Sequence, residues 1–428
     1  MSETTALMPM QQLLRLTAAG ARGDTVGDMA ADWPQVLALA AEQNVLSLVA
    51  CALLHSPALP CPETLRTSLL ERMRAESSVS LVRRQRIMCL LREMRAAGLD
   101  VRLLKGYAVA ESYAHPECRA CVDADVLIPP RQEKDALRYL SGQGFVVSPR
   151  AATSQHAVCK HRKYGVIELH VALYSELIRD VWFRGVGMAE LVQEPPKTVP
   201  AADGGFVTLG DTDQLIFLTL HMLKHFILGG LTLRMMLDVA LFFARHRGTI
   251  DAARYWGILR QVHDENAVAG ILWCMIRHGG FDAADFPGLP PENAPCCDAL
   301  LDDLLRGGYM GVKEEHERYA SGMEYNRLVI RRSKSGLHYA LYMLAWKVKG
   351  AALHMFPSRA MLEETYPAAR HAVLRPVLRL WQMVAYPAQK VASGVLKREI
   401  RTENSAKSDV IRRRIRLFQS LEMLPPAD

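Results

Sequence analysis

The stretch Val122-Asp-Ala-Asp-Val-Leu-Ile128 places two carboxylates inside an apolar run that ends at Pro129-Pro130. Its β-branched and apolar residues predict a strand. Side chains two apart on a strand point to the same face, so we expect Asp123 and Asp125 to lie side by side. Two charges on one half-buried face are costly unless a positive group lies between them, and Mg²⁺ prefers such oxygen ligands. Taken alone, the motif is more typical of a strand-end pair that makes turn hydrogen bonds.

A third carboxylate, Glu168, lies in a second apolar run, Val166-Ile-Glu-Leu-His-Val171, which we also predict to be a strand. If the two strands are neighbours, Asp123, Asp125 and Glu168 can hold two metal ions. Such a pair of ions stabilises the attacking and leaving oxygens of an in-line displacement at phosphorus.

Two features upstream of these acids are suited to a phosphate group. Lys105-Gly106 lies at a predicted strand-to-helix turn, where glycine lets the backbone approach a triphosphate and a helix N-terminus attracts anions. Arg119, four residues before Asp123, is expected to pair either with a phosphate or with the carboxylates.

Strands and helices alternate around these motifs, which predicts a fold with a central sheet. We expect strands at 99–104, 122–128, 145–147 and 166–171, and helices at 107–113 and 131–141. Helical periodicity dominates on both sides, with helices expected at 63–97, 215–228 and 233–245 and again from Cys297. The predicted fold class is α+β, a small mixed sheet with helices embedded between large helical N- and C-terminal regions.

This pattern predicts four regions in the chain. We expect a helical N-terminal region at 1–97, an α/β core at 98–207, a helical region at 208–345 and a helical C-terminal region with a basic tail at 346–428. The tail from 397 to 416 holds eight basic and three acidic residues, so it carries most of the formal net charge of +7. It is typical of a solvated helix, or of a basic helix on an anionic membrane surface or nucleic acid.

Composition excludes several classes of protein. The 428 residues are 50% apolar and 23% charged, which are ordinary values for a folded globular chain. No uninterrupted run of about 18 apolar residues predicts a membrane span, and no secretion signal is visible. Nine cysteines are an odd number, which fits reduced thiols in the cytoplasm better than a disulfide framework. The fingerprints of P-loop, Rossmann and nucleophile-elbow enzymes are missing from the sequence.

The order and spacing of these motifs resemble the bacterial nucleotidyltransferase family of the DNA polymerase β-like superfamily. The resemblance is carried by Leu103-Leu-Lys-Gly106, Arg119, Asp123-Ala-Asp-Val-Leu-Ile128 and Ile167-Glu-Leu-His170. It extends over about 30–270, where Asp32-Trp33, His221-Met-Leu-Lys-His225 and Arg234-Met-Met-Leu-Asp-Val239 also look similar, and we expect Tyr366 to Pro376 to match as well.

The resemblance implies a metal-dependent transfer of a nucleoside monophosphate, with AMP expected, from a nucleoside triphosphate to a hydroxyl or phosphate acceptor. Asp123, Asp125 and Glu168 match the acids that bind two Mg²⁺ ions, and Glu168 is also a candidate general base. Lys105 and Gly106, with Arg119, would hold the triphosphate, although the superfamily usually has a Gly-Ser turn where this chain has Gly106-Tyr107. That departure keeps open an inactive nucleotide-binding or partner-binding module of the same fold.

Other polar residues have a functional and a structural interpretation. His170 shares the strand face of Glu168, and His221, Lys224 and His225 fall on one helical face. We expect these four to support the carboxylates or to face the nucleotide cleft, or else to have packing roles.

The cysteines and one charged pair also have more than one interpretation. Cys118-Arg-Ala-Cys121 with Cys159 and His161 is a weak alternative for a zinc site, and Arg234 with Asp238 reads as an intrahelical ion pair.

The expected partners follow from the same site. They are a nucleoside triphosphate and an unidentified acceptor, which could be a small molecule, a peptide or protein, or a glycan intermediate. Nucleic acid is not expected, because the tail carries most of the excess charge and only one aromatic residue, Phe418, follows it closely. The tail also suggests peripheral contact with a membrane surface.

Overall fold

A computed structural model of the chain describes most of its first three hundred residues and parts of the rest. It describes residues 3–148, 150, 154–183, 185–200, 205–292, 296–308, 311–312, 371–383 and 411–424, and the single positions 325, 328, 329, 362, 366, 368, 385 and 409. The chain divides into two compact units, one of Met1–Met323 with Arg416–Leu424 and one of Glu324–Ile415 with Pro425–Asp428. The sheet and the site belong to the first unit.

The first unit begins with four helices. They are α1 (Glu3–Arg22), α2 (Trp33–Glu42), α3 (Leu46–His55) and α4 (Glu63–Ala96). Asp32 caps α2 by accepting a hydrogen bond from the backbone N–H of Gln35, with Pro34 in the first turn. The 34-residue α4 ends before Gly98, which has φ of +85°, as the sequence predicts.

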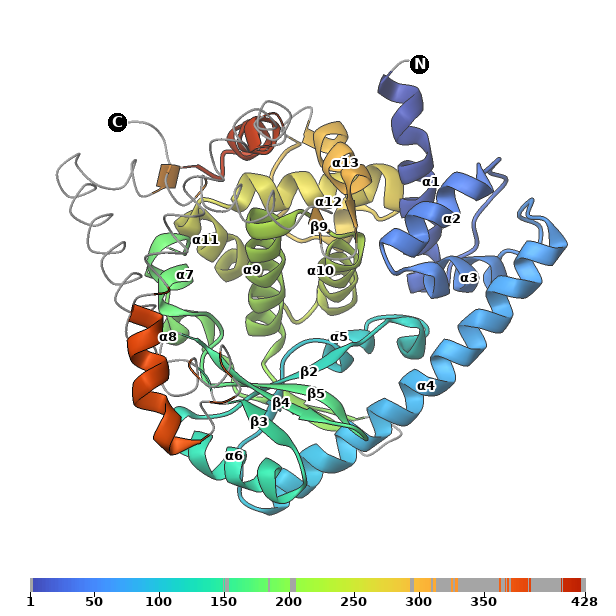
Figure 1. Ribbon diagram of the computed structural model, residues 1–428. Helices are drawn as coiled ribbons and strands as arrows, with labels where there is room; N and C mark the ends of the chain where they lie inside the picture. Colours follow the sequence, from blue (N-terminus) through green and yellow to red (C-terminus); the bar gives the residue numbers. More distant parts are fainter. Residues whose placement is uncertain are drawn as a thin grey trace. The chain divides into compact units, whose positions relative to one another are not determined.

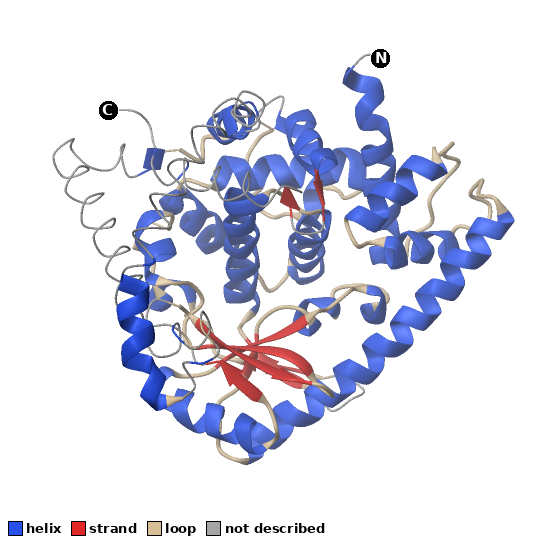
Figure 2. Ribbon diagram, in the orientation of Figure 1, coloured by secondary structure: helices blue, strands red, loops and turns tan. Residues whose placement is uncertain are grey.

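A five-stranded mixed sheet follows α4 (Figure 2). Its strands are β1 (Arg102–Leu103), β2 (Asp123–Leu127), β3 (Val146–Ser148), β4 (His156–His161) and β5 (Gly165–His170). Their spatial order is β1-β2-β5-β4-β3; β2 and β5 are parallel, and every other neighbouring pair is antiparallel. The predicted α+β class with a small mixed sheet is therefore confirmed.

Three local predictions need correction. The strand expected at 99–104 is only the two residues of β1, and the helix expected at 107–113 is the four-residue α5 (Tyr107–Ala110). Strand β4 was not predicted, because its mixture of polar and apolar residues lacks a strong strand signal. The helix expected at 131–141 is a 3₁₀ turn (Pro130–Gln132) followed by α6 (Glu133–Gly142).

The two faces of the sheet have different surroundings. Ala124, Val126, Ile167 and Leu169 are buried in a hydrophobic core with residues of α4 and α6. Because side chains alternate along a strand, the intervening Asp and Glu residues lie on the other face. Figure 1 shows that other face turned toward α9 and α10.

The remaining elements are mostly helical. They are α7 (Glu176–Val181), α8 (Met188–Leu191), a hairpin of β6 (Lys197–Val199) and β7 (Phe206–Thr208), α9 (Asp211–Gly229), α10 (Leu233–His246), α11 (Ala252–Val262), α12 (Glu265–Gly279), α13 (Cys296–Arg306), a short pair of β8 (Gly307–Gly308) and β9 (Gly311–Val312), and 3₁₀ turns at Pro116–Cys118, Ala283–Asp285 and Ala372–Leu374. Within the described part of the chain, none of these helices has both the length and the apolar composition that a bilayer crossing requires. Of the basic tail, only position 409 and 411–416 are described, so the rest of that prediction lies outside the described residues.

Candidate active site

The paired strands β2 and β5 bring the three predicted carboxylates together. Their parallel register places Asp125 directly opposite Glu168, and Asp123 lies two residues earlier on the same face of β2. Oxygen atoms of Asp123, Asp125 and Glu168 all lie within 4.8 Å of one another. The condition set from the sequence, that the two strands be neighbours, is thus met.

Asp125 is the most buried of the three, with 0% of its surface exposed. Its Oδ1 atom lies 3.1 Å from Lys105 Nζ and 3.1 Å from His170 Nε2. Burial opposes ionisation of this carboxyl, but the nearby ammonium and the His170 hydrogen bond outweigh it, and its pKa falls well below the usual range. Asp125 is therefore an anion at neutral pH.

The second oxygen of Asp125 makes the case for a cation. Asp125 Oδ2 is buried and has no hydrogen-bond partner, which is costly for an ionised oxygen. Burial, and after it the neighbouring Asp125 charge, raise the pKa of Asp123. An all-oxygen donor set with one unsatisfied buried anion fits a hard divalent cation such as Mg²⁺.

The Lys105-Gly106 turn lies beside these acids. Gly106 has φ of +67°, and a Cβ added there would lie 3.3 Å from the Asp123 carbonyl oxygen, so the turn favours glycine. Burial opposes the charge on Lys105, but the carboxylates of Asp125, Asp123 and Glu168 outweigh it and raise its pKa. Since α5 spans only four residues, the helix dipole expected from the sequence contributes little.

Helix α9 supplies a cationic and aromatic wall opposite the sheet. His221 Nε2 lies 3.3 Å from Lys105 Nζ, and the rings of His221 and His225 are 4.5 Å apart. Burial and the nearby lysines lower the pKa of both histidines well below the usual value, so His221 is neutral and accepts a hydrogen bond from Lys105. Burial and Lys105 also lower the pKa of Lys224 to about 8.

A pocket of about 360 Å³ lies between the sheet and this wall. It is lined by Lys105, Gly106, Arg119, Asp123, Glu168, His170, His221, Lys224 and His225, together with His156, Arg234, Asp238 and several apolar residues. Nine of the ten site residues proposed from the sequence line it. The tenth, Asp125, is buried directly beneath and contacts two of them.

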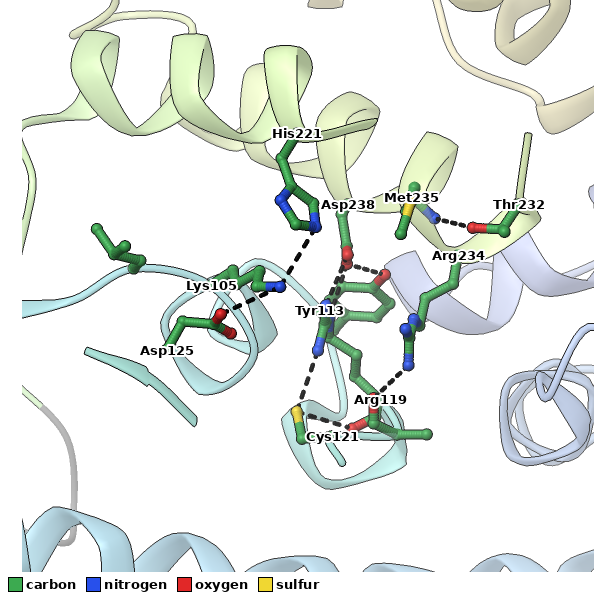
Figure 3. Close-up of polar contacts among 12 residues, drawn as sticks. Lys105, Tyr113, Arg119, Cys121, Asp125, His221, Thr232, Arg234, Met235 and Asp238 are labelled. Atoms are coloured by element: carbon green, nitrogen blue, oxygen red, sulfur yellow. Dashed lines mark hydrogen bonds and ion pairs between the residues drawn. The ribbon is translucent and has the colours of Figure 1, made fainter. Parts of the chain in front are cut away.

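Arg119 has a different partner from those expected. Its Nε and Nη2 atoms donate to both oxygens of Asp238 on α10, at 2.7 and 2.6 Å (Figure 3). Tyr113 also donates to Asp238 at 2.7 Å, and Arg234 donates to the Ala120 carbonyl. The intrahelical pair of Arg234 and Asp238 stays a prediction. Asp238 accepts from residues more than a hundred positions earlier, which no local pattern indicates. A contact of Arg119 with a nucleotide stays a prediction.

Comparison with known proteins identifies the family. Residues 29–278 match the model of a family described as uncharacterised nucleotidyltransferase. The chain belongs to this nucleotidyltransferase family. The match begins before α2 and ends in α12, close to the range expected from the resemblance, and it leaves out the expected segment 366–376. No curated protein matches the chain.

One further histidine lines the pocket, and no pattern in the sequence predicted it. His156, at the start of β4, lies opposite His170 in the β4–β5 register and lines the pocket. Its Nε2 atom lies 3.8 Å from Glu168 Oε1. Because β4 was not predicted, nothing in the sequence placed His156 beside His170. A histidine opposite a known site strand is informative only once the pairing is known.

The cysteines do not join the site as a zinc centre. Cys121 Sγ accepts a hydrogen bond from Arg119, whereas Cys118 contacts Ser77 beside α4. Cys159 is buried in the core on the other face of the sheet. Among the residues that the structure describes, neither of the metal-type clusters includes a cysteine.

Proposed function

We propose that this chain is a metal-dependent nucleotidyltransferase that moves a nucleoside monophosphate, AMP first among the candidates, from a nucleoside triphosphate to a hydroxyl or phosphate of an acceptor. The observation that carries the proposal is the buried, unpartnered Asp125 Oδ2 in a group of three carboxylates that faces a cation-lined pocket. Membership of the family supports transferase chemistry.

Asp123, Asp125 and Glu168 would hold Mg²⁺, in two positions if both ions expected from the sequence bind. When bound, Mg²⁺ neutralises charge that develops on phosphate oxygens and helps to orient the attacking and leaving groups. Lys105 and His170 keep Asp125 ionised and fix its orientation through Oδ1, which leaves Oδ2 available.

The pocket wall would bind the triphosphate. The Gly106 turn allows close approach of the backbone, and Lys105 and Arg119 contribute positive charge. The Lys224 ammonium adds a charge that makes no hydrogen bond or ion pair with the described residues, so it is available for a phosphate oxygen.

Glu168 would accept the proton of an attacking acceptor hydroxyl. Burial opposes its ionisation, but the nearby His170 ring, with Nε2 3.4 Å from Oε2, lowers the Glu168 pKa. The carboxylate is therefore in the basic form that proton acceptance requires. A single oxygen of Glu168 would not serve a metal and a proton at once, so its two oxygens would divide these roles.

The acceptor would be a small molecule, a peptide or protein, or a glycan intermediate. All eight cysteines that the structure describes are free thiols, in keeping with our proposal of a reducing, cytoplasmic setting. Contact of the basic tail with a membrane surface would place the acceptor there, and it is a separate proposal from catalysis.

The test uses the four nucleoside triphosphates labelled at the α-phosphate, with Mg²⁺ and a cell lysate as the source of acceptor. We expect label to move to an acceptor with release of pyrophosphate. Transfer should fall at least about a hundredfold in Asp123→Asn/Asp125→Asn, because the charge that holds the metal is lost. Asp135→Asn, an exposed aspartate on α6, is the matched control and should keep full activity.

Two results would contradict the proposal. Equal transfer by the wild-type chain and the double variant would place the reaction elsewhere. Metal-dependent nucleotide binding without any transfer of label would favour the inactive, nucleotide-binding module instead.

A further inference from the structure

A second group of metal-type ligands shares Glu168 with the carboxylates. His156, Glu168 and His170 each offer one ligand atom, and these atoms lie within 4.8 Å of one another. All three residues line the pocket. Nothing in the transfer proposed above requires two imidazoles at this position.

The sheet register places these three side chains on one face. Glu168 and His170 are two residues apart on β5, and His156 is directly opposite His170 on β4. The two imidazole rings lie 4.9 Å apart at an interplanar angle of 41°. The backbone of two paired strands thus fixes the spacing of the donors before any ion binds.

The distances are longer than those of hydrogen bonds. His156 Nε2 lies 3.8 Å from Glu168 Oε1, and His170 Nε2 lies 3.4 Å from Oε2, whereas an N–H···O hydrogen bond measures about 2.7–3.2 Å. Two ligands each about 2.1 Å from a tetrahedral zinc ion lie about 3.4 Å apart. The spacing therefore resembles that of ligands around an ion more than that of direct partners.

The Nδ1 edge of each ring, on the side away from Glu168, is unpartnered. His170 is only 4% exposed, and its Nδ1 atom has no hydrogen-bond partner; His156 Nδ1 is likewise buried and unpartnered. Asp125 Oδ2, which also lacks a partner, lies next to this group.

We propose that His156, Glu168 and His170 form a mixed nitrogen and oxygen site for a transition-metal ion of the Zn²⁺ class, beside the all-oxygen set of Asp123, Asp125 and Glu168. Two histidines with one carboxylate leave a fourth position open for water or substrate, as in zinc sites that act in catalysis. Because all three ligands line the pocket, a phosphate oxygen bound there would be near the ion. Any role in catalysis rests on the proposed function, whereas metal binding itself does not. With this ion bound, Glu168 is a ligand and no longer the proton acceptor.

Binding at this site changes one hydrogen bond. His170 Nε2 now lies 3.1 Å from Asp125 Oδ1, within reach for proton donation. As a ligand, Nε2 loses its proton to solvent, or to Nδ1 of the same ring by exchange through water. Asp125 Oδ1 keeps the Lys105 ammonium at 3.1 Å, so the loss leaves no uncompensated anion.

The test titrates Co²⁺, a spectroscopic substitute for Zn²⁺, into the metal-free full-length chain without nucleotide. We expect intense tetrahedral visible bands in the wild-type chain, in Asp123→Asn, and in His161→Gln, a matched histidine at the far end of β4. In His156→Gln and His170→Gln we expect at least a tenfold loss of Co²⁺ affinity. Zn²⁺ should displace Co²⁺ and abolish the bands.

Either of two results would overturn the site: unchanged Co²⁺ binding in His156→Gln, or an equal loss in Asp123→Asn, which would mean one acidic site only. If His156→Gln does not fold, X-ray absorption of the wild-type chain with one equivalent of Zn²⁺ decides. Scattering from two imidazole rings supports the site, and its absence overturns it. Because nucleotide is left out, failure of nucleotidyl transfer and failure of this site give different results.

Discussion

Two charged clusters border the same pocket and are built in opposite ways. In the cluster around Asp238, Arg119 donates to both carboxylate oxygens and Tyr113 donates to one of them, and Arg119 and Asp238 are 5% and 6% exposed. In the cluster around Asp125, Lys105 Nζ and His170 Nε2 both lie near Oδ1, and the buried Oδ2 has no hydrogen-bond partner. Both oxygens of Asp238 have hydrogen-bond donors, whereas only one oxygen of Asp125 has them.

The contrast separates structural from functional charge. The Arg119–Asp238 pair ties the loop before β2 to α10, and both oxygens of the Asp238 carboxylate accept hydrogen bonds (Figure 3). A carboxylate that stays ionised with an unpartnered oxygen stabilises the fold poorly, and it is of use only if something binds there. Substitutions at Asp238, Lys224 and Asp123 test this difference between the two clusters.

The largest effect is expected on stability at Asp238. Asp238→Asn leaves the buried Arg119 guanidinium without a counter-ion, so the free energy of unfolding should fall by about 3–5 kcal/mol in urea titrations. The double variant Arg119→Met/Asp238→Leu removes both charges and should recover most of that loss. If Asp238→Asn is as stable as the wild-type chain, the structural role of this pair is wrong.

A middle-sized effect is expected on nucleotide affinity at Lys224. Its pKa of about 8 means that the ammonium is mostly charged at pH 7 and mostly neutral at pH 9, so ATP affinity should fall about tenfold over that interval. Lys224→Met should bind ATP about tenfold more weakly at pH 7 and lose this pH dependence. Lys224→Arg should have the same ATP affinity at pH 9 as at pH 7.

Calorimetric titration at the two pH values measures these affinities. Lys134→Met, an exposed lysine on α6, is the control and should follow the wild-type curve. A wild-type pH profile retained in Lys224→Met would assign the titration to another group.

The smallest effect is expected on thermal stability at Asp123. Burial and Asp125 raise the Asp123 pKa, so its charged form weakens the metal-free fold above that pKa. Asp123→Asn should therefore raise Tm by about 2 °C at pH 7 without metal. The gain should vanish at acidic pH, where the wild-type carboxyl is already protonated. A lower Tm for the variant at pH 7 would show that Asp123 is held by favourable contacts instead.

The sequence predicted the parts of the site that depend on local pattern. The apolar, β-branched runs around Asp123 and Glu168 predict two strands. A charged residue inside such a run is unusual, so each acid is also a candidate site residue. The length of α4 and its end before Gly98 follow in the same way from helical spacing and a glycine stop.

The parts that depend on pairing between distant segments were not predictable. Arg234 lies one helical turn from Asp238, so local spacing favours that pair, whereas tertiary packing brings in Arg119. His156 belongs to a strand whose polar residues hide its alternation, and only the register with β5 shows its position. The sequence shows that Arg119 is charged, but it does not show that the side chain contacts Asp238.

The parallel pairing of β2 with β5 has a consequence for the order of folding. Helix α6 and strands β3 and β4 lie between Asp125 and Glu168 in the sequence, so the pairing of these two residues closes a long loop. Non-local pairing of this kind forms late, because loop-closure entropy must be overcome first. A growing chain that stops short of Gly165 contains both aspartates but no site. Metal-binding capacity therefore emerges with completion of the sheet and could report on that step during refolding.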